Sequence, residues 1–519
     1  LAREVDPQVF VAAPRQNFID ELVLKKLAAL RIPPSPACDE REFIRRAFLD
    51  CVGALPSVDD VTAFSADRSA DKRAKLIDRL LERTEFVDYW TYKWSELLLV
   101  SSRKMQPPNM WAYYRFVRQA VAENRPWDRF ARDVLTAHGS TLENGAANYF
   151  LLHPDVSELT ETTSLTFMGL SIACAKCHNH PLEKWTQDQY WAFANLFSRA
   201  GIKNGDRTNE QFVQTQPVGE APHLRKGVAM PPAPLDGKPL PLESPTDRRG
   251  YFADWLTAPE NPYFAKALVN RVWRNFLGRG LVEAEDDLRQ TNPPTNPELL
   301  DALAKDFVAH KYDVKHAIRT IMLSATYQRS STPVPGNESD DRFYSHYLIR
   351  RLPAEVILDA YSQVTGVPTP FDQIRAGGSG APQAPTNNYP LGTRAQQLPD
   401  TQLISRFLDA FGRAQRAQTC SCERTQDASV PQALHLNNGQ TLNDKLRSKD
   451  SLVAKWLAAN ATDKTVVGDL FLRALAREPS ADEMKKLLAV LADAAGDRRE
   501  GLEDLAWGVL TGREFLFNR

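Results

Sequence analysis

Apolar residues recur three and four positions apart over most of this 519-residue chain. This spacing places apolar side chains on one face of an α-helix. The pattern predicts helices over residues 111–122, 127–137, 158–174, 189–199, 263–277, 297–309, 314–325 and 353–365. The fold class that follows is mainly α.

The helical pattern stops between residues 201 and 245, where eight prolines and several glycines fall. Proline lacks a backbone N–H and breaks helices, so this stretch predicts a linker or a small extended insertion that could contain β-structure. It divides the chain into residues 1–200 and 246–519. We expect two helical domains with the insertion 201–245 between them.

Charge and hydropathy exclude several classes of protein. Basic and acidic residues number 64 and 65 and are interspersed, which argues against a nucleic-acid partner. No apolar run is long enough for a transmembrane segment, and no signal peptide is visible. The chain begins at Leu1 rather than Met, so we expect a mature or trimmed form whose leader has been removed.

One short run of the chain carries a specific chemical motif. Cys174 and Cys177 are separated by two residues and His178 follows directly, which is the CxxCH spacing of covalent c-type haem attachment. On a helical turn, residues three apart share a face, so both thiols can reach the two vinyl groups of one porphyrin while the imidazole binds the iron. The sequence predicts a haem c site. Half of a zinc or iron–sulfur site and a redox dithiol are the alternatives.

The residues after this motif supply a second imidazole and several aromatic side chains. His180 is too close in sequence to the expected iron ligand to reach the opposite face of the same haem, so we expect a structural or supporting role for it. In a non-haem metal site, His180 would be a candidate ligand. A group of apolar residues further on could wall a porphyrin, although ordinary core packing is the favoured interpretation: Trp191, Phe193, Leu196 and Phe197.

The other four cysteines form two contrasting pairs. Cys38 and Cys51 flank a predicted helix that would hold them about 20 Å apart, so we expect two small buried side chains rather than a disulfide. Cys420 and Cys422 are one residue apart, which indicates a metal chelate or a strained disulfide. If the fold brings Cys420 and Cys422 to the CxxCH motif, a metal site with four cysteine ligands becomes the leading alternative to haem.

Four carboxylates fall within five residues at Glu283, Glu285, Asp286 and Asp287. They could bind calcium or serve acid/base chemistry. The glycine turn and the alternating ligand positions of a calcium loop are missing, so a solvated acidic loop is the favoured interpretation.

Several motifs resemble a known pair of families. The run from Cys174 to Pro181, followed by Trp185, resembles the hallmark of the planctomycete cytochrome c-like domain of unknown function. The second half resembles the planctomycete C-terminal domain that accompanies it, through Asn261-Pro-Tyr-Phe-Ala, Val269-Asn-Arg-Val-Trp, Gly278-Arg-Gly-Leu-Val, Asn292-Pro-Pro, Tyr327-Gln-Arg-Ser-Ser, Arg350-Arg-Leu-Pro-Ala-Glu, Arg394-Ala with Gln397-Leu-Pro-Asp, Cys420-Ser-Cys-Glu-Arg, Gln432-Ala-Leu-His-Leu-Asn-Asn-Gly and Glu514-Phe-Leu-Phe-Asn-Arg. The resemblance covers nearly the whole chain. It implies an exported protein from bacteria that degrade complex carbohydrates, and it implies no assigned activity.

The function expected from these observations is electron transfer by an exported, periplasmic or extracellular, mono-haem c-type cytochrome-like protein. A redox protein would be its partner, and a carbohydrate-derived compound is a candidate substrate. Electron relay needs both axial positions of the iron filled, and His435 on an apolar-faced helix is our candidate for the second ligand, with a buried histidine as the equal alternative. The other function classes are a zinc or iron–sulfur module and a carbohydrate- or partner-binding scaffold.

Overall fold

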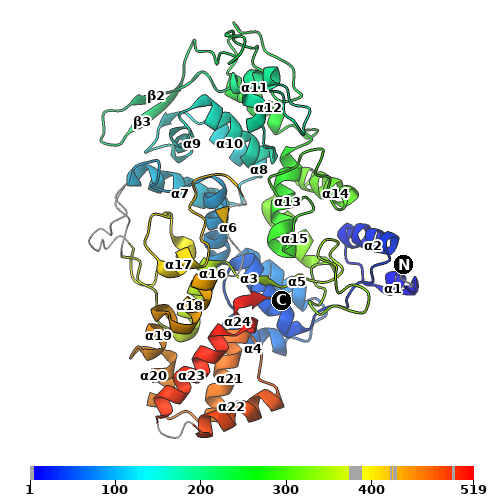
Figure 1. The fold of residues 1–519 in the computed structure, drawn as a ribbon, viewed down its shortest axis with the longest axis vertical. Helices are drawn as coiled ribbons and strands as arrows, with labels where there is room; N and C mark the ends of the chain where they lie inside the picture. The colour runs from blue at the N-terminus through cyan, green and yellow to red at the C-terminus, as the bar shows by residue number, and fades with distance from the viewer. Residues whose placement is uncertain (1–4, 373–388, 421–422, 425–428, 494–496) are drawn as a thin grey trace.

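The structure is a computed structural model that describes residues 5–372, 389–420, 423–424, 429–493 and 497–519. Helices make up most of it, as the periodicity predicted. Figure 1 shows an elongated molecule with α11, α12 and the β2–β3 hairpin at one end and α20 to α23 at the other.

The first half of the chain contains the helices α1 (Gln8–Ala12), α2 (Phe18–Leu30), α3 (Glu40–Val52), α4 (Val58–Ala66), α5 (Lys72–Leu81), α6 (Thr84–Leu97), α7 (Pro107–Ala122), α8 (Trp127–Leu135), α9 (Asn148–Leu152), α10 (Val156–Met168) and α11 (Gln187–Ala194). Two short 3₁₀ helices lie among them, η1 (Gly145–Ala147) and η2 (Ala173–Lys176).

The second half contains α12 (Arg248–Leu256), α13 (Phe264–Leu277), α14 (Pro297–Ala309), α15 (Val314–Leu323), α16 (Ala354–Thr365), η3 (Ala395–Gln397), α17 (Arg406–Ala410), α18 (Val430–Asn438), α19 (Gln440–Arg447), α20 (Leu452–Ala458), α21 (Asp463–Leu475), α22 (Ala481–Asp493), α23 (Arg498–Thr511) and α24 (Arg513–Leu516). The predicted helix 297–309 coincides with α14. Its start is fixed by Asn296, whose side chain accepts a hydrogen bond from Leu299 N, and by a proline in the first turn.

Strands are few among the described residues. β1 (Gly139–Ser140), β3 (Gln211–Thr215) and β2 (Ala200–Asn204) form an antiparallel sheet in that order, with Ile202 opposite Val213. The expected insertion therefore does contain β-structure. β4 (Arg350–Arg351) pairs with β5 (Phe517–Asn518) at the C-terminus.

The predicted helix 158–174 is interrupted. α10 ends at Met168, because Gly169 adopts a left-handed conformation with φ of 64°, which terminates the helix. The CxxCH motif consequently begins on the separate helix η2 instead of at the end of a long α-helix.

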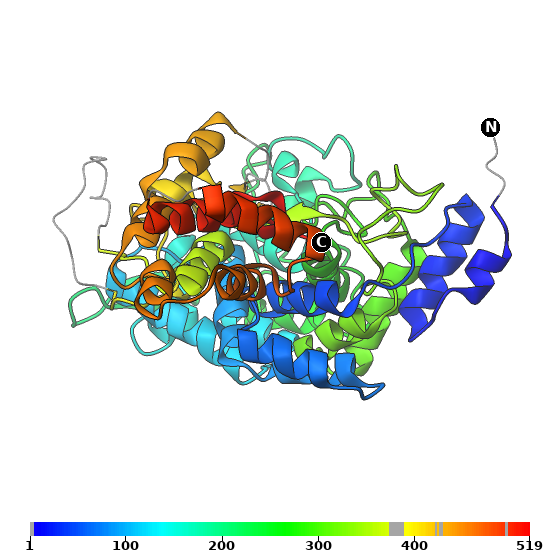
Figure 2. The ribbon, with the colours of Figure 1, turned by 90° about the horizontal axis from the view of Figure 1, so that it is seen from below.

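The two halves share one continuous hydrophobic core. α2 packs on α14, α5 on α15, and α10 on α13. The buried carboxylate of Asp50 in α3 accepts hydrogen bonds from Tyr327 (3.1 Å), Tyr347 (2.8 Å) and Asn518 (2.7 Å). A side chain of the first half is thereby fixed by three residues of the second, and Figures 1 and 2 both show the C-terminus of the chain beside the blue helices of the first half.

Cys38 and Cys51 are free and buried, as expected for small apolar side chains. Burial raises the pKa of both thiols, which keeps them protonated and unreactive. Across the described residues, none of the helices is both long enough and apolar enough to cross a lipid bilayer.

Candidate functional sites

The two thiols of the CxxCH motif lie at the surface. Cys174 is in η2 and Cys177 directly follows it, and both side chains are exposed and free of disulfide bonds. In a 3₁₀ helix the residues i and i+3 lie one above the other, so both cysteines belong to the same side of this short helix. Ala175 between them is fully buried and anchors the opposite side in the core.

The motif is attached to α11 by side-chain hydrogen bonds. The carbonyl oxygen of Lys176 accepts hydrogen bonds from Gln187 Nε2 (3.0 Å) and Trp191 Nε1 (3.1 Å). Gln187 N in turn donates to Asn179 Oδ1 at 3.0 Å. α11 starts here because Thr186 and Gln189 form a capping box. These bonds fix the backbone of an otherwise exposed loop.

His178 is exposed, and one of its ring nitrogens is occupied. Nδ1 lies 2.7 Å from the carbonyl oxygen of Asn179. A carbonyl oxygen only accepts hydrogen bonds, so Nδ1 carries the hydrogen and the neutral ring leaves Nε2 with a free lone pair. This arrangement, in which the second nitrogen donates to a backbone carbonyl, is the usual one for histidines that bind a metal.

His180 has the opposite arrangement. Its Nδ1 accepts a hydrogen bond from Leu182 N at 3.2 Å, and its backbone N–H donates to the carbonyl oxygen of Trp185 at 2.8 Å. The side chain of His180 thus stabilises the turn after the motif, in agreement with a structural role. Trp185 is almost fully buried, whereas Leu182 is 52% exposed.

The aromatic residues of α11 belong to the protein core. The ring of Phe193 lies 5.1 Å from that of Phe252 in α12, and the ring of Phe197 lies 5.5 Å from it. Trp191, Phe193, Leu196 and Phe197 are all buried. Core packing, the favoured interpretation of this group, therefore accounts for it.

The structure does not bring His435 to the CxxCH motif. His435 lies in α18, where its Nε2 is 2.9 Å from Thr441 Oγ1 and its ring packs edge-on against Phe407 and Phe411. Figure 1 shows α18 in the lower half of the molecule and α11, on which η2 packs, at the opposite end. These contacts satisfy His435 within the C-terminal half.

Cys420 is surrounded by other residues than those of the CxxCH motif. It is disulfide-bonded, so its sulfur does not offer the thiolate that a zinc or iron–sulfur site requires. Cys420 lines a cavity whose described wall includes no residue of the CxxCH motif. Cys422 lies outside the described residues.

This cavity, called the charged cavity below, has a volume of about 150 Å³ and lies between helix α6 of the first half and segments of the second half. By volume it has room for on the order of ten water-sized groups. Its charged lining includes Lys93, Glu96, Arg271, Arg274, Glu285 and Arg424. The sequence did not predict that these residues form one site, because the first and last of them are more than 300 positions apart in the chain.

A buried ion network closes one side of the charged cavity. Arg424 donates to Glu355 Oε2 at 2.8 Å, to Glu96 Oε2 at 2.9 Å and to the hydroxyl of Tyr92 at 3.1 Å. Burial opposes ionisation of Glu355, but Arg424 and the hydrogen bonds outweigh it and lower the pKa of Glu355 to about 2. Arg424 thus links α6 to α16 as a permanent cation.

The acidic segment predicted to be a solvated loop forms another side of the charged cavity. The side chain of Glu285 is only 17% exposed and lies 2.8 Å from Arg274 Nε. Burial raises the pKa of Glu285, and the neighbouring Asp286 acts in the same direction against the opposing effect of Arg274. The solvated-loop prediction is therefore wrong for Glu285, because α13 supplies a cation and covers the carboxylate.

The same segment joins the charged cavity to the CxxCH region. Leu288 N donates to the carbonyl oxygen of Gly169 at 2.9 Å, and Gln290 N donates to Glu183 Oε1 at 2.5 Å. Arg271, which lines the cavity, donates to the carbonyl oxygens of Leu165 and Thr166 at the end of α10. The cavity thus contacts the end of α10 through Arg271, and the residues that follow the acidic segment contact Gly169 and Glu183 on either side of the motif.

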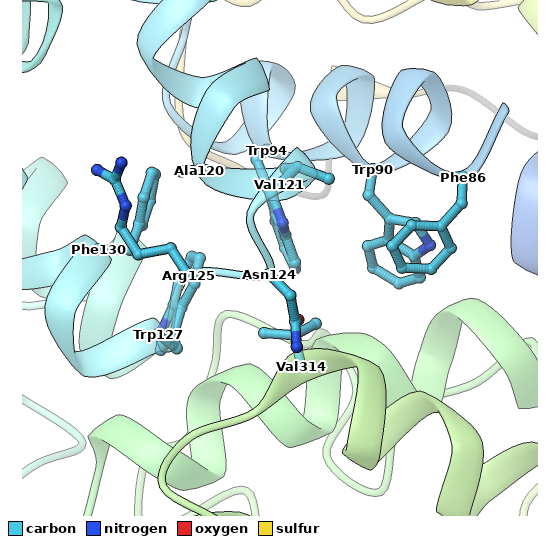
Figure 3. A pocket seen from close by; sticks show the side chains of 10 residues that line it. All are labelled: Phe86, Trp90, Trp94, Ala120, Val121, Asn124, Arg125, Trp127, Phe130 and Val314. Atoms are coloured by element: carbon cyan, nitrogen blue, oxygen red, sulfur yellow. The ribbon is translucent and has the colours of Figure 1, made fainter. Parts of the chain in front are cut away.

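A second cavity lies on the other side of Trp90 and Trp94 and has a different character. Figure 3 shows aromatic and aliphatic side chains of α6, α7, α8 and α15 around it, together with Asn124 and Arg125 from the connection between α7 and α8. The ring centroids of Trp94 and Trp127 are 5.0 Å apart. Its volume of about 20 Å³ holds one water molecule at most, so it is a packing defect of the core.

Comparison with known families divides the chain into two matched segments. A model named PSCyt2, described as a protein of unknown function (DUF1549), matches residues 18–201 and so includes the CxxCH motif. A model named PSD1, described as a protein of unknown function (DUF1553), matches residues 248–491. No curated protein and no solved structure matches the chain. These two matches fit the planctomycete pair of domains that the motifs resemble, and the charged cavity is lined by residues of both matched segments.

Proposed function

We propose that this protein is an exported electron-transfer protein that carries one haem c on Cys174 and Cys177, with His178 as the proximal iron ligand. The observation that carries the proposal is the exposure of these three side chains and the contacts that they make. Both thiols are free and exposed, and the imidazole that follows them has its Nδ1 engaged by the Asn179 carbonyl, so that Nε2 is the nitrogen left for the iron. These are the requirements for two thioether bonds and one iron–imidazole bond.

The donor geometry favours haem over a tetrahedral metal. A zinc or cluster site needs three or four ligand atoms that converge on one point. In the described part of the chain, the group of histidine, cysteine and acidic side chains that converges in this way is Asp306, His310 and His316, with ligand atoms within 4.8 Å of one another. The CxxCH side chains are not such a group, as expected where two sulfurs bond to separate edges of a porphyrin.

The chain's own residues would hold the haem in a fixed orientation at the surface. A bound haem c supplies reversible one-electron chemistry at its iron. Gln187 and Trp191 hold the backbone between the two cysteines, and the Asn179 carbonyl keeps Nε2 of His178 available. Leu182 adds an exposed apolar side chain in the same loop. The exposed position favours electron exchange with a redox protein partner, and a carbohydrate-derived compound remains the proposed source of electrons.

A visible absorption spectrum tests this proposal. The chain should be produced in a host that matures c-type cytochromes, because the thiols must be joined to haem after export. We expect an intense Soret band that remains in the denatured protein. The variant His178→Ala should keep the attached haem and shift the band, since only the iron ligand is lost. A colourless protein with stoichiometric zinc would overturn the proposal in favour of a non-haem site.

A further inference from the structure

Four cationic side chains line the charged cavity, and three of them have strong partners. Arg424 is held by two carboxylates, Arg274 by Glu285, and Arg271 by two backbone carbonyls. Lys93 is the fourth. Within the residues that the structure describes, no carboxylate lies within 4.0 Å of its ammonium group.

Lys93 occupies a position that disfavours its charge. It lies on α6 between the buried side chains of Tyr92 and Trp94. The Tyr89 ring, whose centre is 5.3 Å from Nζ, attracts the ammonium group only weakly. Burial lowers the pKa of Lys93 to about 8. Glu96 opposes this shift, whereas Arg424 and Arg274 add to it by repulsion. A lysine that is desolvated beside other cations has a larger neutral, nucleophilic fraction near physiological pH than an ordinary lysine.

We propose that Lys93 is a covalent capture site for small hydroxylated aldehydes and ketones, which enter the charged cavity and form an imine with its amine. The volume of about 150 Å³ limits the ligand to a few carbon atoms with their oxygens. The lining favours hydroxyl groups on this ligand, because Glu285 and Asp286 can accept hydrogen bonds and Arg271 can donate them. This activity goes beyond electron transfer and does not depend on haem.

The reaction needs only groups that the cavity contains. The lone pair of neutral Lys93 Nζ attacks the carbonyl carbon, the carbonyl π electrons move to oxygen, and a proton passes from nitrogen to that oxygen to give a carbinolamine. Glu285 then donates a proton to the leaving hydroxyl group, water departs, and the nitrogen lone pair forms the C=N bond of an iminium ion. Burial raises the pKa of the Glu285 carboxyl, which acts against its ion pair with Arg274 and in the direction of the protonated form that this step requires.

Reductive trapping tests the proposal on the full chain. The protein is incubated at pH 7 with glyceraldehyde and sodium cyanoborohydride, and the labelled lysines are identified by peptide mass spectrometry. We expect Lys93 to be labelled about tenfold faster than the exposed Lys25, because burial lowers the pKa of the Lys93 amine. Its labelling rate should rise with a midpoint near pH 8. Labelling of Lys93 no faster than Lys25 would overturn the proposal.

Two further comparisons separate recognition from simple reactivity. Propanal lacks the hydroxyl groups of glyceraldehyde, so the ratio of Lys93 to Lys25 labelling should fall several-fold when it replaces glyceraldehyde. An unchanged ratio would contradict recognition of hydroxylated ligands. The variant Glu285→Gln should slow labelling of Lys93 about tenfold if this carboxyl is the proton donor. The matched control Glu298→Gln, which alters the partner of Lys25, should leave the labelling rate of Lys93 unchanged.

Discussion

The CxxCH segment and the charged cavity are built in opposite ways. The segment has its reactive groups within five consecutive residues, all at the surface, where two side-chain hydrogen bonds to Lys176 hold the backbone. The cavity collects charged groups from both halves of the chain and keeps them half-buried. The segment suits attachment of a large group that needs access. The cavity suits a small ligand that must be taken out of water.

The energetic consequences differ as well. A hydrogen bond at an exposed loop contributes about 1 kcal/mol to stability. A buried charge that loses its partner destabilises by about 3–5 kcal/mol. Changes in the cavity should therefore affect the fold of both halves, whereas changes at the segment should affect local order and haem attachment.

Removal of Arg424 should have the largest effect on stability. The variant Arg424→Met leaves Glu355, whose side chain is 1% exposed, and Glu96 without their cation. We expect the free energy of unfolding, measured by urea denaturation, to fall by about 3–5 kcal/mol. The control Lys25→Met breaks an exposed pair with Glu298 and should cost about 1 kcal/mol or less. Equal losses in the two variants would contradict a structural role for the buried network.

Acid should weaken the same network. The pKa of Glu355 in the folded protein, about 2, lies below the ordinary value of 4.5. Its stabilisation is therefore fully present above about pH 4.5 and is lost as the pH falls toward 2. We expect this one carboxylate to account for about 3 kcal/mol of the decrease in the free energy of unfolding between pH 5 and pH 2. The difference in unfolding free energy between the parent and Glu355→Gln should shrink by that amount over this range, and a constant difference would refute the assignment.

The smallest effect is expected at the CxxCH segment. The variant Gln187→Met removes one hydrogen bond to the Lys176 carbonyl while keeping the side-chain length, and Trp191→Phe removes the other while keeping an aromatic, though smaller, side chain. Each should weaken local order by about 1 kcal/mol, which corresponds to roughly fivefold faster amide hydrogen exchange across residues 174–178. Unchanged exchange in both variants would show that other contacts hold the segment.

The sequence predicted the local features well. Helix α14 follows from its apolar spacing and from the Asn296 cap, and the CxxCH motif is recognisable because its chemistry lies within five residues. The break after Met168 was missed because apolar residues continue at helical spacing beyond Gly169, although a glycine at that point is a common helix end.

The charged cavity could not be predicted, because it depends on tertiary contacts. Lys93 and Arg424 are 331 positions apart and meet only when α6 packs beside the second half. A signal was present at Lys93, which interrupts an aromatic run between Tyr92 and Trp94. A charged residue inside such a run is expected to face either solvent or a polar cavity, and sequence alone does not distinguish the two.

The most direct test of the central proposal is the intact mass of the denatured protein from a host that matures c-type cytochromes. We expect the mass of the polypeptide plus one haem, with Cys174 and Cys177 both protected from alkylation. The double variant Cys174→Ser, Cys177→Ser should have the unmodified polypeptide mass. A parent protein that also has the unmodified mass, with both thiols open to alkylation, would contradict haem attachment at this motif.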